Sequence, residues 1–591
     1  MRRTISAVLL ITLLAFALRI SLLGHQELRG DEGFSWNYIQ GTPAAILERI
    51  VREGDPQPPL HYWLLWGWSR LNGDSEFALR FPSVFFSTLL VPLMYQVGRK
   101  LWRKEAGLLA ALVTALQPQQ IWLAQDARNM YVLALVGVLG TLWLLPSVLQ
   151  PGGRRNWLGY VACGLLAMYS HYYAVFALLA QSAYVLEARP SIRQALRWIS
   201  AGLTIAALLV PWAIIVLPVY TSGQLAEPGN LAFTAYAGRV VGEIFAGPAF
   251  PMTTRLILAL AFGAVACAGL IARIPWRLYL LAGVIVPLIG IYAVVGLRST
   301  FNAYYFVFAF PAINFLLAHG FLAIGRRARW LGVGLLVALL AVYAVGLSNY
   351  YFDPRYSRTR GLREAAEYIT RHARPGDTFL ANFPDPVQGY YLRHLELPYK
   401  MLPLQPNFDQ AGVNAALEQL EQQRLWFIPM RASQWDRDGY VESRLKETAL
   451  LADDQSFTQT RLMLFDALDQ AAPLQARFGD SIELIGYALA PNRLTLVWQA
   501  TGMPARDYTV FTHALAADGS LVAQHDAPPI QPTSQWKPGQ IILDVHEFAI
   551  PTDEPITLTA GMYRPDTGER LPTSATAPEP NAAVITSLHP Q

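Results

Sequence analysis

The sequence predicts a multi-pass α-helical membrane protein with a C-terminal extracytoplasmic α/β unit and a β-sandwich. Three observations lead to this fold class. Of the 591 residues, 53% are hydrophobic and only 15% are charged, whereas soluble domains carry about 25% charged residues. Apolar runs of helical length follow one another as far as about Tyr351. Beyond that point the composition is that of an ordinary soluble protein, which predicts one membrane domain and one or two soluble domains.

The apolar part contains about eleven runs that suit membrane-spanning helices, each of which needs about 20 apolar residues. The first run is too long for the core of a signal peptide and no small-residue cleavage site follows it, so we interpret it as a retained helix. The two runs beside His171 are short, and a helical hairpin bent there is an alternative. The predicted spans are 4–23, 80–98, 106–124, 130–149, 157–170, 172–187, 197–218, 254–272, 278–297, 304–324 and 330–350.

Basic residues predict which loops face the cytoplasm. They gather before the first span and then after every second span, as the positive-inside rule requires of cytoplasmic loops. The N-terminus is therefore predicted to be cytoplasmic, and an odd number of spans places everything after Tyr351 outside the cell membrane. These cations are Arg2, Arg3, Arg99, Lys100, Arg103, Lys104, Arg154, Arg155, Arg189, Arg193, Arg197, Arg273, Arg277, Arg326, Arg327 and Arg329.

Two of the predicted external loops are long, at 24–79 and 219–253. The first contains two amphipathic stretches, 43–50 and 60–68, and the second of these is rich in Trp and Tyr. We expect both to form short helices at the membrane interface, where these aromatic residues prefer to lie.

The soluble part is predicted to hold two domains, after a membrane domain of residues 1–352. Residues 356–470 alternate between helix and strand patterns, which is typical of an α/β unit with a parallel sheet. Residues 475–591 show short alternating runs separated by turn residues, which is typical of a β-sandwich, and the Pro/Ala-rich tail from Thr573 is expected to be loose. The clearest elements are helices at 362–372 and 413–423 and strands at 378–381, 425–428, 494–499 and 508–513.

Several function classes are not supported by the sequence. The formal net charge is only +4 and no basic block is present, which argues against nucleic acid as a partner. Cys163 and Cys267 both fall in apolar runs, so a disulfide framework is not expected. The sequence contains no phosphate-binding glycine loop, dinucleotide fingerprint, zinc-ligand spacing or serine nucleophile elbow. An enzyme of this kind would have to draw its energy from an activated substrate that reaches the outer face.

Acidic residues from two loops are predicted to meet at the outer face. Asp31 and Glu32 follow the first span, and Asp126 lies at the outer end of the third. Taken alone, the first two could be solvated loop acids beside Arg29 and the third an interfacial anchor. Acids near a membrane face also suit a general base, a metal ligand or an ion pair. Their convergence on one face favours a site, with Asp31, Glu32 and Asp126 as catalytic candidates.

Basic and aromatic residues are predicted on the same face. Arginine offers the paired donors that suit a phosphate or pyrophosphate group, although each of these residues is also compatible with ordinary interfacial anchoring. A lone histidine such as His61 is more often a packing residue than a ligand. The substrate-binding candidates are Arg80, Arg128, Arg298, His61, His171, Tyr172 and Tyr304.

Several ordered segments resemble the bacterial family-39 glycosyltransferases, which are relatives of protein O-mannosyltransferases and of lipid A aminoarabinose transferases. The resemblance covers about residues 1–380, and the β-rich tail looks like the sandwich appended to some members. The matching segments are Asp31-Glu32, Pro58 to Tyr62, Gly73 to Ser83, Gln125 to Tyr131, Ser170 to Tyr173, and Tyr304 to Pro311.

The resemblance implies a GT-C fold and an inverting glycosyl transfer. Such enzymes move a sugar from a polyprenyl-phosphate donor to an acceptor on the outer face of the bilayer. Carried over, Asp31 is expected to be the general base, and Asp126 a second acid that supports acceptor or sugar binding. Arg128 and Arg298 are expected to bind the phosphate leaving group. The acceptor, which is a protein, a lipid or an envelope glycan, is not identified.

One departure from the family pattern affects the phosphate site. Relatives often carry His or Lys before Pro58-Pro59, but this chain has the uncharged Gln57. Phosphate neutralisation must therefore rest more heavily on arginines, or the donor differs. No cofactor is firmly implied, although some relatives use a divalent cation. A non-catalytic carrier or flippase of lipid-linked saccharides is the main alternative, and a membrane-tethered binding protein is a third.

Overall fold

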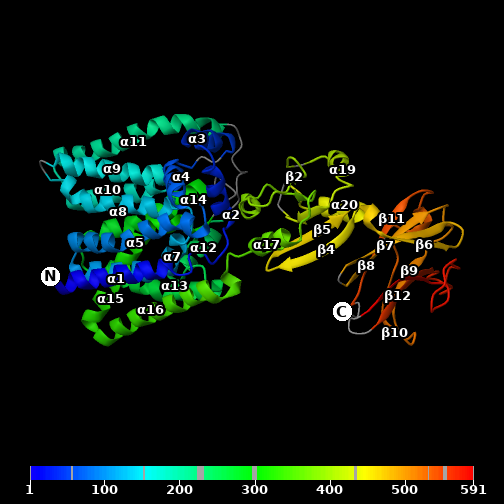
Figure 1. Ribbon diagram of the computed structural model, residues 1–591. Coiled ribbons are helices and arrows are strands. Elements are labelled where there is room, and N and C mark those ends of the chain that lie inside the picture. Colours follow the sequence, from blue (N-terminus) through cyan, green and yellow to red (C-terminus); the bar gives the residue numbers. More distant parts are fainter. Residues whose placement is uncertain are drawn as a thin grey trace. The chain divides into compact units, whose positions relative to one another are not determined.

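The computed structural model shows two compact units, Met1–Thr359 and Arg360–Gln591 (Figure 1). Unit 1 is built from helices and unit 2 from helices and strands, so the membrane and soluble parts predicted from composition are separate bodies. The residues that the structure describes are 2–54, 57–150, 153–221, 232–295, 302–406, 408–431, 435–490, 492–529, 531–549 and 555–589.

Unit 1 is a bundle of helices joined by short loops, with its longest helices composed mainly of apolar residues. Its helices are α1 (Arg2–Ile20), α2 (Gly30–Tyr38), α3 (Pro43–Arg52), α4 (Leu60–Asn72), α5 (Glu76–Leu101), α6 (Lys104–Leu116), α7 (Pro118–Ala124), α8 (Met130–Val148), α9 (Arg154–Ser170), α10 (Ala174–Ala188), α11 (Ile192–Thr221), α12 (Phe233–Ala246), α13 (Met252–Ile271), α14 (Arg277–Val295), α15 (Phe310–Arg327) and α16 (Arg329–Phe352), with the 3-10 helices η1 (Ala303–Ala309) and η2 (Pro354–Tyr356).

Each of the eleven predicted spans coincides with helix in the structure. Among the described residues, eight helices are long and apolar enough to cross a membrane unaided. The remaining predicted spans correspond to the shorter helices α9 and α10, and to the pair α6 and α7. The two short helices expected in the first long loop are present as α3 and α4, and their place at the membrane interface stays a prediction. Helices α2 and α12 have no counterpart in the prediction.

The third predicted span is broken into α6 and α7 at Gln117. The next residue is Pro118, whose ring disfavours a helical conformation of the residue before it, and Gln117 accordingly adopts φ −62° and ψ 120°. Proline at the first position of a new helix is well tolerated, because the missing N–H would have no intrahelical partner. The break sets α7 apart as a short helix that ends beside Asp126.

Unit 2 begins with a mixed five-stranded sheet and its helices. Its elements are α17 (Leu362–His372), β1 (Thr378–Ala381), α18 (Pro386–Leu392), β2 (Tyr399–Met401), α19 (Gln410–Glu418), β3 (Leu425–Ile428), α20 (Tyr440–Thr448), β4 (Leu450–Phe457) and β5 (Thr460–Asp466). The strand order is β2-β1-β3-β5-β4, in which β1 pairs in parallel with β2 and β3 whereas β5 runs antiparallel to β3 and β4. The predicted parallel sheet is thus only partly correct, because β4 and β5 form a hairpin.

The rest of unit 2 consists of two four-stranded antiparallel sheets with the orders β10-β9-β12-β13 and β11-β8-β7-β6. Buried side chains of both sheets, such as Trp498 and Leu558, share one core, as expected of a sandwich. The expected loose tail is wrong at its end, because β13 pairs with β12. The strands are β6 (Ala472–Phe478), β7 (Ile482–Ala490), β8 (Arg493–Ala500), β9 (Thr509–Ala516), β10 (Leu521–Ala527), β11 (Ile541–Glu547), β12 (Ile556–Tyr563) and β13 (Ala583–Leu588).

Candidate active site

Asp31 and Glu32 lie in the first turn of α2, directly after the first membrane helix. The Glu32 carboxylate reaches back to accept a hydrogen bond from the backbone N–H of Arg29 at 3.0 Å. Acidic side chains at a helix N-terminus are stabilised by the partial positive charge there. The local sequence therefore forms a short helix that aims the two carboxylates in different directions.

Glu32 is fully buried and paired with Arg80 of α5. The Arg80 guanidinium donates to both carboxylate oxygens, at 2.7 and 2.8 Å, and also to the backbone carbonyls of Leu23, Gln26 and Glu27. Burial raises the pKa of Glu32, but the charge and hydrogen bonds of Arg80 outweigh it and bring the pKa to about 2. The geometry favours a structural role for this pair, which joins three segments; contact of either residue with a substrate stays a prediction.

Asp126 is held at the end of α7. Its side chain is 2% exposed and accepts hydrogen bonds from Arg29 Nε at 2.7 Å and from the backbone N–H of Arg128 at 2.9 Å. Ala127, the next residue, donates its backbone N–H to Glu32 at 2.8 Å. The two loops predicted to meet are therefore joined directly by hydrogen bonds.

Asp31 is the most exposed of the three acids, at 33% of its side chain, and it faces three donors. It pairs with Arg29, lies 3.2 Å from Arg128 Nη1, and accepts a hydrogen bond from the Tyr304 hydroxyl at 3.2 Å. Burial raises the pKa of Asp31, but the charges of Arg128 and Arg29 overcome this effect and hold the pKa well below its usual range. Asp31 is thus ionised and partly open to a ligand.

The two arginines beside Asp31 retain unused donors. Among the described residues, the buried atoms Arg29 Nη2 and Arg128 Nε have no hydrogen-bond partner. Burial lowers the pKa of Arg128, but the Asp31 charge raises it well above its usual value, so the group stays cationic. Buried donors on a fixed cation are rarely left unpaired, and a phosphate or carboxylate oxygen would satisfy them.

Aromatic rings enclose the same acids. The Tyr304 ring stacks on Trp122 and meets Tyr131 edge-on, and Arg29 lies over both Trp122 and Tyr304. His171 packs against Tyr131, with ring centroids 4.8 Å apart. Burial lowers the pKa of His171 to about 3, so its ring is neutral at physiological pH.

The remaining predicted ligands lie at different depths. His61 is fully buried, with Nδ1 3.2 Å from Asn129 Oδ1 and Nε2 3.4 Å from Ser35 Oγ, and burial lowers its pKa to about 3. Both ring nitrogens thus face protein groups, and contact of His61 with a substrate stays a prediction. The Tyr172 hydroxyl accepts a hydrogen bond from Trp212 of α11 at 2.5 Å. Arg298 lies outside the described residues.

Arg358 is a site residue that sequence reasoning missed. It follows the last membrane helix, yet its guanidinium lies 3.7 Å from Asp126 and 3.9 Å from Glu32 and stacks 4.2 Å above the Trp122 ring. It also donates to the carbonyls of Trp122 and Gln125 at 2.9 Å each, and so caps the C-terminal end of α7. Nothing in the local sequence marked this residue, because Trp122, Gln125 and Asp126 are more than 230 positions away.

The three acids of the site are paired with arginines, and a divalent cation at the site stays a prediction. Such ions need several carboxylate or carbonyl oxygens directed at one point. Here each of Asp31, Glu32 and Asp126 faces an arginine, and within the described part of the chain no group of three or more His, Cys, Asp or Glu side chains is placed to hold a metal ion.

The fold agrees with that of a solved crystal structure. The crystal structure of apo ArnT from Cupriavidus metallidurans superposes with a TM-score of 0.52 at 14% identity, over 79% of this chain and 99% of ArnT. The chain has the GT-C fold. Residues 56–215 also match the family model of dolichyl-phosphate-mannose-protein mannosyltransferases. These findings confirm the multi-pass helical fold class and the resemblance predicted from the sequence, and they support a glycosyltransferase.

Two further structures are more distant matches. ArnT bound to undecaprenyl phosphate gives a TM-score of 0.48 at 16% identity, over 79% of this chain and 99% of ArnT. The apo oligosaccharyltransferase of Archaeoglobus fulgidus gives 0.47 at 10% identity, over 96% of this chain and 97% of that one. No curated protein matches the sequence.

Proposed function

We propose that this GT-C protein transfers a sugar from a polyprenyl-phosphate donor to a hydroxyl group of an acceptor, with inversion at the anomeric carbon. One observation carries the proposal: Asp31, an ionised and partly exposed carboxylate, lies between two arginines that retain buried, unused donors. A base and an anion site side by side are what transfer from a phosphate-linked sugar requires. The match to a dolichyl-phosphate-mannose family supports a donor of this class.

The proposed reaction is a single displacement. Asp31 accepts the proton of the acceptor hydroxyl as its oxygen attacks the anomeric carbon. The bond between that carbon and the phosphate oxygen breaks, and the polyprenyl phosphate leaves with the bonding electrons. Arg128 and Arg29 stabilise the charge that develops on the phosphate, and Arg298 is proposed to assist. Asp126 holds Arg29 and the backbone of Arg128 in place.

The ion pairs suggest an order of binding. A carboxylate that faces two cations is a weak base, and Asp31 has a pKa well below its usual range. A donor phosphate would draw Arg128 away from Asp31, because the phosphodiester of the donor carries a full negative charge that competes for the same cation. Losing that cation raises the pKa of Asp31 and makes it a better base. We therefore propose that the donor binds first and that its phosphate activates Asp31.

The position of the site supports transfer outside the cytoplasm. The acids follow α1, at the end opposite its basic N-terminus, on the face that the distribution of cations predicts to be external. A lipid-linked donor on that face needs no nucleotide site. The acceptor is proposed to be any partner with a free hydroxyl group that reaches this face, whether protein, lipid or envelope glycan.

The test is transfer from a synthetic polyprenyl-phosphate sugar, with donor binding measured in parallel. Asp31→Asn should lower turnover about 10²–10⁴-fold, because the amide cannot accept a proton, and should leave donor binding nearly intact. Arg128→Ala should instead weaken donor binding, because a charge-assisted hydrogen bond is worth about 1.5–3 kcal/mol.

The matched control is Glu48→Gln, which changes an exposed acid of α3 in the same long loop. It should leave both measurements unchanged. Near-normal turnover of Asp31→Asn would refute the assignment of the base, and transfer unaffected by every change at Asp31, Asp126 and Arg128 would refute the site.

A further inference from the structure

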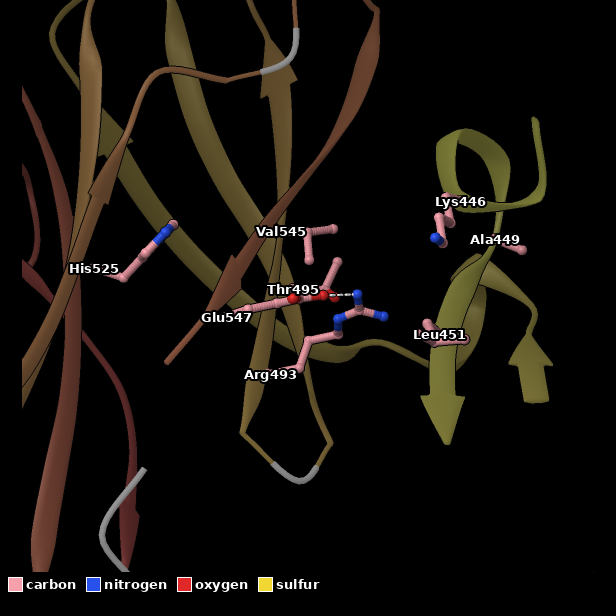
Figure 2. A pocket seen from close by; sticks show the side chains of 8 residues that line it. All are labelled: Lys446, Ala449, Leu451, Arg493, Thr495, His525, Val545 and Glu547. Carbon is pink, nitrogen blue, oxygen red and sulfur yellow. Dashed lines mark hydrogen bonds and ion pairs between the residues drawn. The ribbon is translucent and has the colours of Figure 1, made fainter. Parts of the chain in front are cut away.

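Unit 2 contains a cleft between the outer face of the sandwich and the preceding α/β part. Its first lobe, about 330 Å³, is lined by β8 and β11 on one side and by α20 and the start of β4 on the other (Figure 2). A second lobe of about 490 Å³ shares Leu451, Arg493 and Glu547 with the first. Each lobe falls in the size range of small-molecule sites.

Charged groups in the cleft are fixed in pairs. Arg493 pairs with Glu547 across neighbouring strands, as the dashed line in Figure 2 marks. Lys446 reaches into the first lobe and is held by Glu442 at 2.6 Å. Arg461 pairs with Asp454 in the second lobe. Because each cation has a carboxylate partner, the side chains are preorganised and the cleft carries no excess of either charge.

A buried relay positions His525 at the edge of the first lobe. His525 Nδ1 lies 2.9 Å from His546 Nδ1, and His546 Nε2 lies 2.9 Å from Asp544, which also accepts a hydrogen bond from Trp498 at 3.2 Å. His546 is fully buried and Asp544 is 3% exposed. The relay joins β10 of one sheet to β11 of the other.

The relay fixes the hydrogen-bonding role of His525. The Asp544 carboxylate only accepts, so His546 carries its proton on Nε2 and its Nδ1 is an acceptor. His525 must then donate from Nδ1, which leaves Nε2 as the ring nitrogen that faces away from the relay. Burying a carboxylate and an imidazole is costly unless both are paired. Here the pairing ends in one oriented imidazole beside the cleft. In Figure 2 the His525 ring extends from β10 toward the other lining residues.

Apolar surface lies between these polar groups. Leu451, Ala449 and Val545 line the first lobe, and Phe548 lines the second. Figure 2 shows Leu451 and Val545 on opposite sides of the space beside Arg493. A ligand of this cleft must therefore present both polar groups and nonpolar C–H surface.

We propose that this cleft binds an uncharged saccharide of at least two sugar residues. Sugar hydroxyls both donate and accept hydrogen bonds, which matches fixed donors on Lys446 and Arg493 beside the Glu547 carboxylate and the His525 imidazole. A multivalent anion would meet the carboxylates of Glu547 and Asp454, and a cation would meet the arginines. Two adjoining lobes give room for more than one ring. The proposal stands independently of the membrane site in unit 1.

The test uses the full-length protein in detergent and saturation-transfer NMR with three uncharged disaccharides: maltose, cellobiose and diacetylchitobiose. At least one should bind with a Kd of about 1 mM or below. Arg493→Gln and His525→Phe should each weaken that binding by about tenfold, a loss of about 1.4 kcal/mol. Inorganic phosphate is the charged competitor and should not displace the sugar.

Two controls separate this cleft from other sites. Arg371→Gln changes an exposed arginine of α17 that bonds its own helix, and Asp31→Asn changes the membrane site; neither should alter disaccharide binding. The proposal is overturned if none of the three disaccharides binds at about 10 mM, if phosphate displaces the sugar, or if binding survives both cleft variants. His525→Phe keeps a planar ring, so it remains informative if Arg493→Gln does not fold.

Discussion

The three acids of the candidate site, Asp31, Glu32 and Asp126, differ in burial and in hydrogen-bond partners. These differences suggest a different role for each acid. Glu32 is fully buried and satisfied by Arg80 and by backbone donors. Asp126 is nearly buried and orients two arginines. Asp31 alone combines an ionic environment with partial exposure. A residue that is saturated by fixed donors cannot exchange partners with a substrate at low cost, so Asp31 remains the best candidate for the base.

The pH dependence of transfer provides a test at the level of a single hydroxyl. The pKa of Asp31 is depressed, so its basic form persists at acid pH and is lost only as the pH falls through that low value. Tyr304→Phe removes a hydrogen bond that lowers this pKa, so the acid limb of kcat/KM should move to higher pH. That limb reports the free enzyme.

The control for this profile is Tyr305→Phe, which removes a hydroxyl 3.5 Å from Asn302 and should leave the limb in place. A wild-type limb near pH 6 would contradict the low pKa of Asp31. If the acid limb of kcat/KM is unchanged in Tyr304→Phe, the Tyr304 hydroxyl does not lower the pKa of Asp31.

Arg358 gives a second residue-scale prediction. Its guanidinium caps α7 and approaches Asp126, so Arg358→Ala should lower turnover at least about tenfold while donor binding changes less. Turnover falls because a displaced α7 would move Asp126 out of its position in the site, and small displacements of catalytic groups slow the reaction strongly. Arg358→Lys should recover part of the lost turnover, because lysine keeps the positive charge but cannot donate to both carbonyls as the planar guanidinium does. Arg355→Ala is the matched control, because Arg355 is exposed and pairs with Asp353; equal effects of the two alanine variants would refute the role.

The acids of this site could be predicted from sequence, whereas their partners could not. Asp31 and Asp126 stood out because the predicted topology places acids from two different loops on the same face of the membrane. The pairing of Glu32 with Arg80 and the approach of Arg358 depend on which loops fold together, and no local pattern encodes that. The sequence identified Arg29 only as a chain neighbour of Asp31 and Glu32. Its position over Trp122 and Tyr304 is a tertiary contact that the sequence does not reveal.

The length of the apolar runs predicted where the helices lie, but it did not predict where a helix is interrupted. Each apolar run became helix because a run of that length has no better way to satisfy its backbone in a bilayer. The break at Pro118 follows from local sterics that the span count ignored. The short helix α2 was missed because Gly30 to Tyr38 has no clear apolar stripe. The β4–β5 hairpin was missed because its strands carry polar residues such as Asp453 and Asp454.

The packing of α13 against α15 depends on glycine at the crossing. A Cβ at Gly269 would overlap the carbonyl oxygen of Leu316, and one at Gly320 would overlap that of Val265. Small residues allow such close approach of helices in membranes. Gly269→Val should therefore separate the helices and destabilise the protein by about 1–3 kcal/mol, as overpacking commonly does.

Thermal unfolding in detergent, followed by tryptophan fluorescence, measures this effect. Gly263→Val is the matched control on the same helix, because a Cβ there meets nothing within 4 Å. Its melting temperature should stay close to that of the wild type. Equal melting temperatures for the two valine variants would refute the crossing as the source of stability.

For the whole molecule, composition alone separated the two units. The apolar fraction falls after Tyr351, and the compact units divide at Thr359. The further division of the soluble part at about residue 470 stays a prediction. The sandwich was predictable because its alternating strands and glycine turns are local patterns. Its cleft was not, because Lys446 and Arg493 meet only after the α/β part and the sandwich have packed together.

Membrane topology is the last prediction, and it decides which face carries the site. Cations after every second span predict a cytoplasmic N-terminus and an external unit 2. Ser520 lies in an exposed turn between β9 and β10, so Ser520→Cys should react in intact cells with a thiol reagent that cannot cross the membrane. The background chain replaces Cys163 and Cys267, both free thiols, by alanine.

A cysteine placed at Arg155, in the first turn of α9 and among the cations predicted to be cytoplasmic, serves as the opposite control. It should react only after the cells are opened. External labelling of Ser520→Cys together with protection of Arg155→Cys requires an odd number of crossings between Arg155 and unit 2. Protection of Ser520→Cys would mean that one of the shorter helices, α6 with α7, α9 or α10, does not cross. The acids at the end of α1 would still face outward in that case, because their side depends on α1 alone. Labelling of both cysteines in intact cells would instead contradict the assignment of the basic loops.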